Sequence, residues 1–191
     1  MGSSEVLGDE RDDALLVARS LEDPRCFGDL FRRHAPPLHR YAARRLGSDL
    51  ADDIVAETFH TAFRARSAYD PARGDVRPWL WRITTNLIRR HYRSELRMLR
   101  ALARTGVDPA LESHADRVAE QVSAAAESPR LASALAGLRK GDRDVLLLTA
   151  WGELSYQQVA DVLGIPVGTV RSRLNRARTK VRDALGGTAD E

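Results

Sequence analysis

Cysteine is nearly absent from this chain of 191 residues, because Cys26 is the single one. One thiol excludes an intramolecular disulfide and any metal site built from a cysteine cluster. Long hydrophobic runs are also missing: the longest, residues 145–151, is far shorter than the roughly 20 residues of a membrane-spanning helix. The acidic start, MGSSEVLGDERDD, lacks the basic beginning and apolar core of a signal peptide. We therefore expect a cytoplasmic protein without membrane insertion.

Aromatic residues make up only 6% of the chain and lysine occurs twice, whereas alanine, leucine and arginine are abundant. Alanine and leucine favour helices over strands, and no alternating strand pattern is visible. The pair Pro36-Pro37 is expected to interrupt a helix or to start the next one. Apolar residues recur at helical spacing over 11–20, 25–34, 49–67, 79–99, 129–138, 142–152, 155–163 and 167–185.

Charge divides the chain into four blocks. The balance of basic over acidic residues is −5 for residues 1–30, +8 for 31–100, −3 for 101–128 and +3 for 129–191. The segment around 100–128 consists mainly of small, polar and acidic residues, and it has too few large apolar residues to build a core. We therefore predict an all-α fold with two small helical domains, 11–98 and 129–186, joined by a flexible acidic linker over 99–128.

A helix-turn-helix motif is predicted in the second domain, in LSYQQVADVLGIPVGTVRSRLNRAR. Ser155 with Gln158 fits a capping box, so a helix begins there. Ala160 is small enough for two helices to cross closely, and Gly164 tolerates the positive φ of a tight turn. Val170 then begins the buried face of the next helix. Cap, turn and apolar spacing agree on a DNA-binding motif.

Arginine dominates the second helix of this motif, which carries six basic residues and a single acidic one over 171–183. The first turns of a recognition helix offer side chains to base edges, and arginine can bond guanine in a bidentate manner. Arginines further along hold phosphates, which positions the helix without reading sequence. The predicted DNA-binding residues of this domain are Ser155, Tyr156, Val167, Thr169, Arg171, Ser172, Arg173, Arg176 and Arg178.

Two blocks in the first domain, DLADDIVAETFHTAFRA and RPWLWRITTNLIRRHYR, precede the linker and the helix-turn-helix. This order resembles a bacterial RNA polymerase sigma factor of the extracytoplasmic-function (ECF) group, which belongs to the sigma-70 family. The resemblance covers residues 11–97 and 129–186. It implies a subunit that binds core RNA polymerase and directs it to promoters by recognising the minus-10 and minus-35 DNA elements, without a cofactor. It also implies an anti-sigma factor as a partner.

The same resemblance assigns roles to the first domain. Asp52, Asp53 and Glu57 match the acidic residues with which such factors dock on the polymerase, and Asp53 and Glu57 share one helix face. The other block matches the element that reads and opens the minus-10 region, where polar groups and aromatic rings can bind an unstacked base. Trp79 is expected in the core and Trp81 is a candidate for stacking. The residues so implied for the minus-10 element are Asp70, Arg73, Trp81, Arg82, Asn86, Arg89, Arg90 and Arg93.

Two other classes of protein were considered. A stand-alone helix-turn-helix regulator needs no polymerase, and its first domain would sense a ligand or form a dimer. An enzyme is suggested only by Glu57 and His60, whose ExxH spacing occurs in di-iron bundles. Such a site needs a second ExxH, and the sequence has none; a phosphate-binding loop, an HExxH motif and a nucleophile elbow are missing as well. We therefore expect a protein that is not an enzyme.

Overall fold

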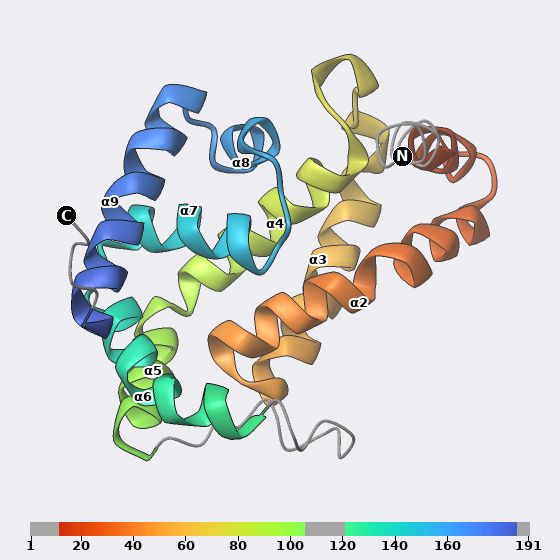
Figure 1. Cartoon of the computed structure of the whole chain (residues 1–191). Coiled ribbons are helices and arrows are strands. Elements are labelled where there is room, and N and C mark those ends of the chain that lie inside the picture. The colour runs from red at the N-terminus through yellow and green to blue at the C-terminus, as the bar shows by residue number, and fades with distance from the viewer. Residues whose placement is uncertain (1–11, 106–120, 187–191) are drawn as a thin grey trace.

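The computed structural model describes residues 12–105 and 121–186 (Figure 1). Every regular element in these two ranges is helical, so the all-α prediction is confirmed. A short helix over 12–19 comes first, and 3₁₀ turns lie at Pro24–Cys26, Arg66–Ala68 and Pro71–Arg73. The remaining helices are α2 (Phe27–Leu46), α3 (Ser48–Ala65), α4 (Val76–Arg90), α5 (Tyr92–Thr105), α6 (Gln121–Gly137), α7 (Lys140–Ala150), α8 (Tyr156–Leu163) and α9 (Val167–Leu185).

The first domain is built on α2, α3 and α4, which pack against one another. Contrary to the prediction of a break, α2 runs without interruption through Pro36 and Pro37. Each proline removes one N–H from the helix, but the buried face that continues on both sides, with Leu30 before and Leu38 after, holds the helix on the core. Gly47 ends α2 with φ of 92°, and α3 begins at the next residue without a side-chain cap.

The long helix predicted over 79–99 is two helices. His91 lies between α4 and α5 and leaves helical geometry, with φ of −92° and ψ of 19°. The bend lets α5 pack against both α2 and α6. Helix α5 extends to Thr105 and α6 begins at Gln121, so both ends of the segment 99–128 are helical. Its central part, 106–120, lies outside the described residues, so the flexibility of the linker stays a prediction.

The second domain consists of α6, α7, α8 and α9, with α9 packed on the other three. Helix α7 carries an unexpected run of buried charged residues, Asp142, Arg143 and Asp144. The domain does not stand apart from the first one: α8 packs along α4, and α6 packs along α5. Figure 1 shows α4 passing through the middle of the molecule, with α2 and α3 on one side and α7, α8 and α9 on the other.

Candidate nucleic-acid interface

The helix-turn-helix has the local geometry that its sequence predicts. The hydroxyl of Ser155 accepts a hydrogen bond from the backbone N–H of Gln158 at 3.2 Å, and the Gln158 side chain accepts one from the N–H of Ser155 at 3.0 Å. Gly164 ends α8 in the left-handed region, with φ of 64°, and its N–H donates to the carbonyl of Ala160. Val170 is fully buried at the start of α9. The predicted capping box and turn are therefore confirmed.

The polar side chains of α9 divide into two groups. Arg171, Ser172 and Arg178 are exposed, whereas Arg173 is half-buried and its guanidinium lies over Gly141 at the start of α7. Arg176 points to the same helix, where its Nη2 lies 3.1 Å from a carboxylate oxygen of Asp142. These two arginines therefore also hold the domain together, a role that the charge pattern did not indicate.

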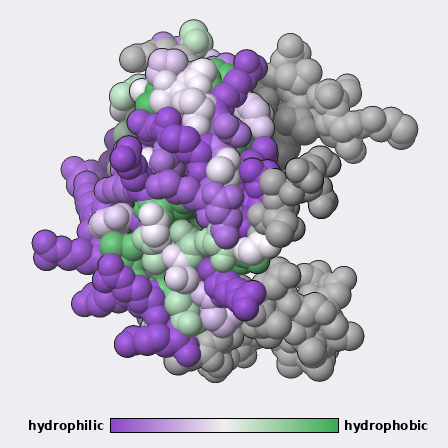
Figure 2. Space-filling model, turned by 60° about the vertical axis from the view of Figure 1, so that its left-hand side comes forward, coloured by the Kyte–Doolittle hydropathy of each residue, from purple (hydrophilic) through white to green (hydrophobic). Residues whose placement is uncertain are grey.

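Around the motif, Ser155 and Tyr156 are exposed, and Val167 and Thr169 are half-buried. Figure 2 shows the side of the molecule on which α9 lies: hydrophilic residues dominate this surface and enclose a hydrophobic area. A shallow groove between α7 and α9 joins apolar and basic side chains; it is lined by Leu146, Arg178, Val181, Arg182, Leu185 and Gly186. The exposed guanidinium groups make this side suited to a polyanion.

In the first domain, the segment before α4 and the beginning of α4 enclose an open depression. The Tyr69 hydroxyl donates to the carbonyl of Gly74 at 3.0 Å, and a carboxylate oxygen of Asp70 accepts from the N–H of Ala72 at 2.9 Å. Burial, followed by the nearby carboxylates, raises the pKa of Tyr69 to about 12. The depression has both rings and charges on its walls, which are formed by Ala68, Tyr69, Asp70, Gly74, Asp75, Pro78, Trp79 and Arg82.

Further along α4, Asn86 and Arg90 are exposed, and Arg93 is exposed at the beginning of α5. Arg89 is half-buried, because its Nε donates to Asp144 of α7 at 2.9 Å. The predicted minus-10 residues of α4 and α5 thus lie at neighbouring positions, and two of them, Arg82 and Arg89, are already engaged by the second domain. The side chain of Arg73 lies outside the described residues.

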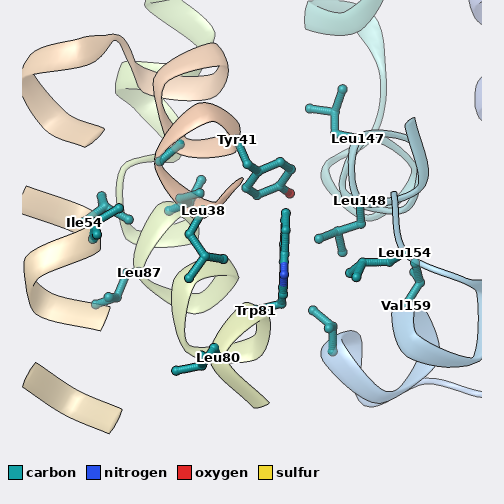
Figure 3. Close-up of a cluster of buried hydrophobic side chains, with 14 of the residues drawn as sticks. Leu38, Tyr41, Ile54, Leu80, Trp81, Leu87, Leu147, Leu148, Leu154 and Val159 are labelled. Carbon is teal, nitrogen blue, oxygen red and sulfur yellow. The ribbon is translucent and has the colours of Figure 1, made fainter. Parts of the chain in front are cut away.

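The burial of the two tryptophans of α4 is the reverse of what the sequence predicts. Trp79 is only partly buried and its ring packs on Tyr69, with the centroids 5.0 Å apart. Trp81 is 1% exposed and meets the Tyr41 ring at 4.9 Å in an edge-on arrangement. Figure 3 shows the Trp81 indole between Tyr41 and the side chains of the second domain. Trp81 is therefore a buried contact between the domains in this arrangement, and its ring is not open to a base.

The acidic residues predicted to meet the polymerase lie on the outside of α3. Asp52, Asp53 and Glu57 are all exposed. A carboxylate oxygen of Asp52 lies 3.1 Å from Nε2 of His39, and one of Glu57 lies 3.8 Å from Nδ1 of His60. His60 itself is exposed on the same helix, as a residue with a purely surface role would be. This surface is accessible to a basic partner.

A buried ionic network joins the domains, and the sequence pattern did not predict it. Arg45 of α2 donates to Glu95 of α5 at 2.6 Å, to the Tyr41 hydroxyl at 2.8 Å and to Asp144 of α7 at 2.8 Å. Arg143 of α7 lies 3.2 Å from the second carboxylate oxygen of Glu95. The side chains of Arg45, Glu95, Arg143 and Asp144 are at most 1% exposed. Charged residues are normally expected at the surface, so hydrophobic periodicity could not place them here.

Protonation in this network follows from burial and from the neighbouring charges. Burial raises the pKa of the Tyr41 phenol to about 12, although the adjacent Arg45 acts in the opposite direction. Burial alone would lower the pKa of Arg45, but Tyr41, Glu95 and Asp144 outweigh it and raise that pKa. The tyrosine is therefore neutral and the arginine charged near neutral pH, and the arginine N–H donates to the phenol oxygen.

Among the helices that the structure describes, none is long and apolar enough to cross a membrane. The geometry defines a class: a two-domain helical protein with a helix-turn-helix in one domain, a basic strip on α4 and α5 in the other, and an exposed acidic surface on α3.

Comparison with known proteins places the chain within this class. Residues 30–107 match the model of sigma-70 region 2, and residues 129–181 match that of sigma-70 region 4. RNA polymerase sigma factor CnrH of Cupriavidus metallidurans is 35% identical over 197 residues, which cover 94% of this chain and 97% of CnrH. ECF RNA polymerase sigma factor SigC of Mycobacterium tuberculosis is 32% identical over 184 residues, which cover 95% and 93% of the two chains.

The solved structure of CnrH in complex with the cytosolic domain of CnrY superposes with a TM-score of 0.67 at 31% identity, and the match covers 93% of this chain and 99% of CnrH. The chain belongs to the sigma-70 family, in its ECF group of RNA polymerase sigma factors. It is therefore a transcription initiation factor that binds core RNA polymerase and directs it to promoters. The alternative of a stand-alone regulator is wrong.

Proposed function

We propose that the two domains read two separate promoter elements, with residues 11–98 on the minus-10 element and 129–186 on the minus-35 element. The observation that carries this division is the confirmed helix-turn-helix in the second domain, with Arg171, Ser172 and Arg178 exposed on its second helix. An exposed arginine near the start of a recognition helix is placed for base edges, and those further along are placed for phosphates. Arg173 and Arg176 contribute to the same contact with DNA, and in the free protein both also contact α7.

In the first domain, Asn86, Arg90 and Arg93 contact unpaired minus-10 DNA together with Arg82 and Arg89. An amide can bond the edge of an unstacked base, and guanidinium groups hold the backbone. The depression beside Tyr69 and Trp79 has a polar and aromatic lining that suits one such base. Asp70 and Arg73, from the segment before α4, belong to the same contact.

The exposed acidic surface of α3 docks on the polymerase. Asp53 and Glu57 lie one helical turn apart, and both carboxylates are exposed to a partner that carries arginines or lysines. In this role the chain acts in the cytoplasm, has no catalytic activity of its own and needs no cofactor. A second protein that forms a complex with it, as the cytosolic domain of CnrY does with CnrH, would act as its anti-sigma factor.

Reconstituted transcription tests this assignment. The full chain, bacterial core polymerase and a library of genomic fragments are combined, and transcript starts are mapped. Starts that share two sequence motifs at a fixed spacing support the proposal. Each motif is then assigned by variants: Arg171→Ala is expected to relax selection of the upstream motif, and Asn86→Ala of the downstream one. Core-dependent starts with a single motif, unaffected by Asn86→Ala, would contradict the role given to α4.

A further inference from the structure

The second helix of the helix-turn-helix, α9, packs against α7, and two of its arginines take part in that contact. The buried face of α9 is formed by Val170, Leu174 and Ala177. Arg173 and Arg176 are three residues apart, so they lie on the same side of the helix, next to this buried face. Both reach the first turn of α7, which is formed by residues that the sequence did not connect with DNA.

Gly141, in the first turn of α7, leaves the space in which the Arg173 guanidinium lies. A Cβ added to Gly141 would be 2.7 Å from Nη1 of Arg173 and 3.2 Å from its Cζ. Any side chain at position 141 therefore displaces the end of this arginine. Gly141 lies within α7 and has no positive φ, and glycine is less favourable than alanine inside a helix. The arginine, and not the backbone, thus requires a glycine here.

Asp142, the next residue of α7, holds the second arginine. Its Oδ1 lies 3.1 Å from Nη2 of Arg176, and the side chain of Asp142 is 5% exposed, whereas that of Arg176 is 53% exposed. The carboxylate is therefore fixed inside the domain, while much of the guanidinium still faces solvent. A guanidinium has five N–H donors in a rigid fork, so a bond to one carboxylate oxygen leaves others for a phosphate.

The arginines of α9 therefore differ in how much order DNA must impose on them. Arg171 and Arg178 are exposed, and a long exposed side chain loses rotamer freedom when it binds. That loss weakens binding by roughly two- to tenfold for each side chain. A guanidinium that the fold already holds loses less, so the contacts of Arg173 and Arg176 with α7 favour their binding to phosphate.

We propose that Gly141 and Asp142 are positioning residues of the DNA interface, which hold the guanidinium groups of Arg173 and Arg176 where the phosphates of duplex DNA accept from them. This inference rests on the DNA contact proposed above for α9, and it adds residues of α7 that act through the arginines. Charge alone predicts the opposite effect for Asp142, because an acidic residue beside the interface repels phosphate. The sign of the effect therefore separates positioning from simple electrostatics.

The first test displaces Arg173 without loosening the fold. Gly141→Ala is compared with Gly137→Ala, the same change at the end of α6, where a Cβ would meet no atom within 4 Å. Fluorescence anisotropy of the full chain measures binding to a random-sequence duplex of about 20 base pairs at about 50 mM salt, where phosphate contacts dominate. Gly141→Ala is expected to weaken binding about threefold, and Gly137→Ala to leave it unchanged. Because alanine favours a helix, Gly141→Ala should melt no lower than the unmodified chain, so a structural defect cannot explain its weaker binding.

The second test removes the carboxylate that holds Arg176. Asp142→Ala is compared with Asp183→Ala, which removes the same charge from an exposed position of α9. Asp142→Ala is expected to weaken binding to the same duplex about threefold, although it makes the protein more basic, whereas Asp183→Ala should not weaken it. In the background of Arg176→Gln, Asp142→Ala should have no further effect on binding, while a general folding defect would persist there.

Equal affinities for Gly141→Ala and Gly137→Ala, or tighter binding by Asp142→Ala, would overturn the proposal. Transcription with core polymerase then shows which proposal has failed. If Arg171→Ala still relaxes selection of the upstream motif, the DNA contact of α9 stands and only the positioning role of α7 is wrong. If Arg171→Ala has no effect either, the function proposed for α9 fails together with it.

Discussion

The turn glycine of the helix-turn-helix permits a quantitative test, because a second glycine provides its control. Gly164 ends α8 at φ of 64°, whereas Gly168 lies inside α9 without a positive φ. A Cβ added at either position would meet no atom within 4 Å. Gly164→Ala and Gly168→Ala therefore differ in backbone strain and not in crowding.

The expected magnitudes follow from that difference. In the unfolded chain, either substitution reduces conformational freedom and so favours the native state by about 0.4–1 kcal/mol. For Gly164→Ala, the left-handed conformation costs about 1–2 kcal/mol, which leaves a net destabilisation of roughly 1 kcal/mol. For Gly168→Ala no such strain arises, and we expect a gain of roughly 0.5 kcal/mol. The two variants should thus differ by about 1–2 kcal/mol, which is the native-state strain itself.

Urea denaturation of the full chain, followed by circular dichroism, measures the difference. Because m is about 1–3 kcal/mol/M for small proteins, the midpoints should separate by roughly 0.5–1 M. Gly164→Asn serves as a partial rescue, since asparagine tolerates the left-handed region better than alanine does. Equal free energies of unfolding for Gly164→Ala and Gly168→Ala would refute the claim that the positive φ at the turn strains any side chain larger than that of glycine.

Other predictions concern the cap, the polymerase surface, the recognition helix and pH. Ser155→Ala should lower the free energy of unfolding by about 1 kcal/mol in the same urea assay, whereas Ser155→Thr should retain most of it. Asp53→Ala should weaken binding to core polymerase in a pull-down while leaving the affinity for duplex minus-35 DNA unchanged; loss of DNA binding with normal core affinity would reverse that assignment. Arg171→Ala should reduce minus-35 selectivity and leave core affinity intact, as measured by transcription from promoters with altered upstream motifs. Since the folded-state pKa of Tyr41 is raised to about 12 from about 10, the stability that it contributes is complete below pH 10 and is lost as pH rises through 12; Tyr41→Phe should flatten the pH dependence of the melting temperature in that window.

The sequence was most informative where a local rule decides the structure. The cap at Ser155, the turn at Gly164 and the ends of α9 depend on a few adjacent residues with well-known preferences, and all were predicted. The family resemblance supplied what local rules cannot, namely the polymerase as a partner. The DNA and polymerase contacts of individual side chains stay predictions.

Long-range packing accounts for the errors. Trp81 is buried because α7 and α8 cover it, and periodicity within α4 carries no information about a domain that lies many residues away. The same holds for Asp144, whose partners Arg45 and Arg89 are 99 and 55 residues distant. The continuous α2 shows the complementary case, in which tertiary contacts override the local effect of Pro36 and Pro37.

Helix α9 is exposed and α4 is partly covered, so the two helices differ in the nucleic-acid contacts that the free protein can make. Arg171 and Arg178 of α9 are exposed and can touch intact double helix, whereas two arginines of α4, Arg82 and Arg89, are engaged by the second domain. The two domains of the free protein therefore offer unequal positive charge to a nucleic acid: the exposed arginines of α9 are available, and two of those on α4 are used in contacts within the protein.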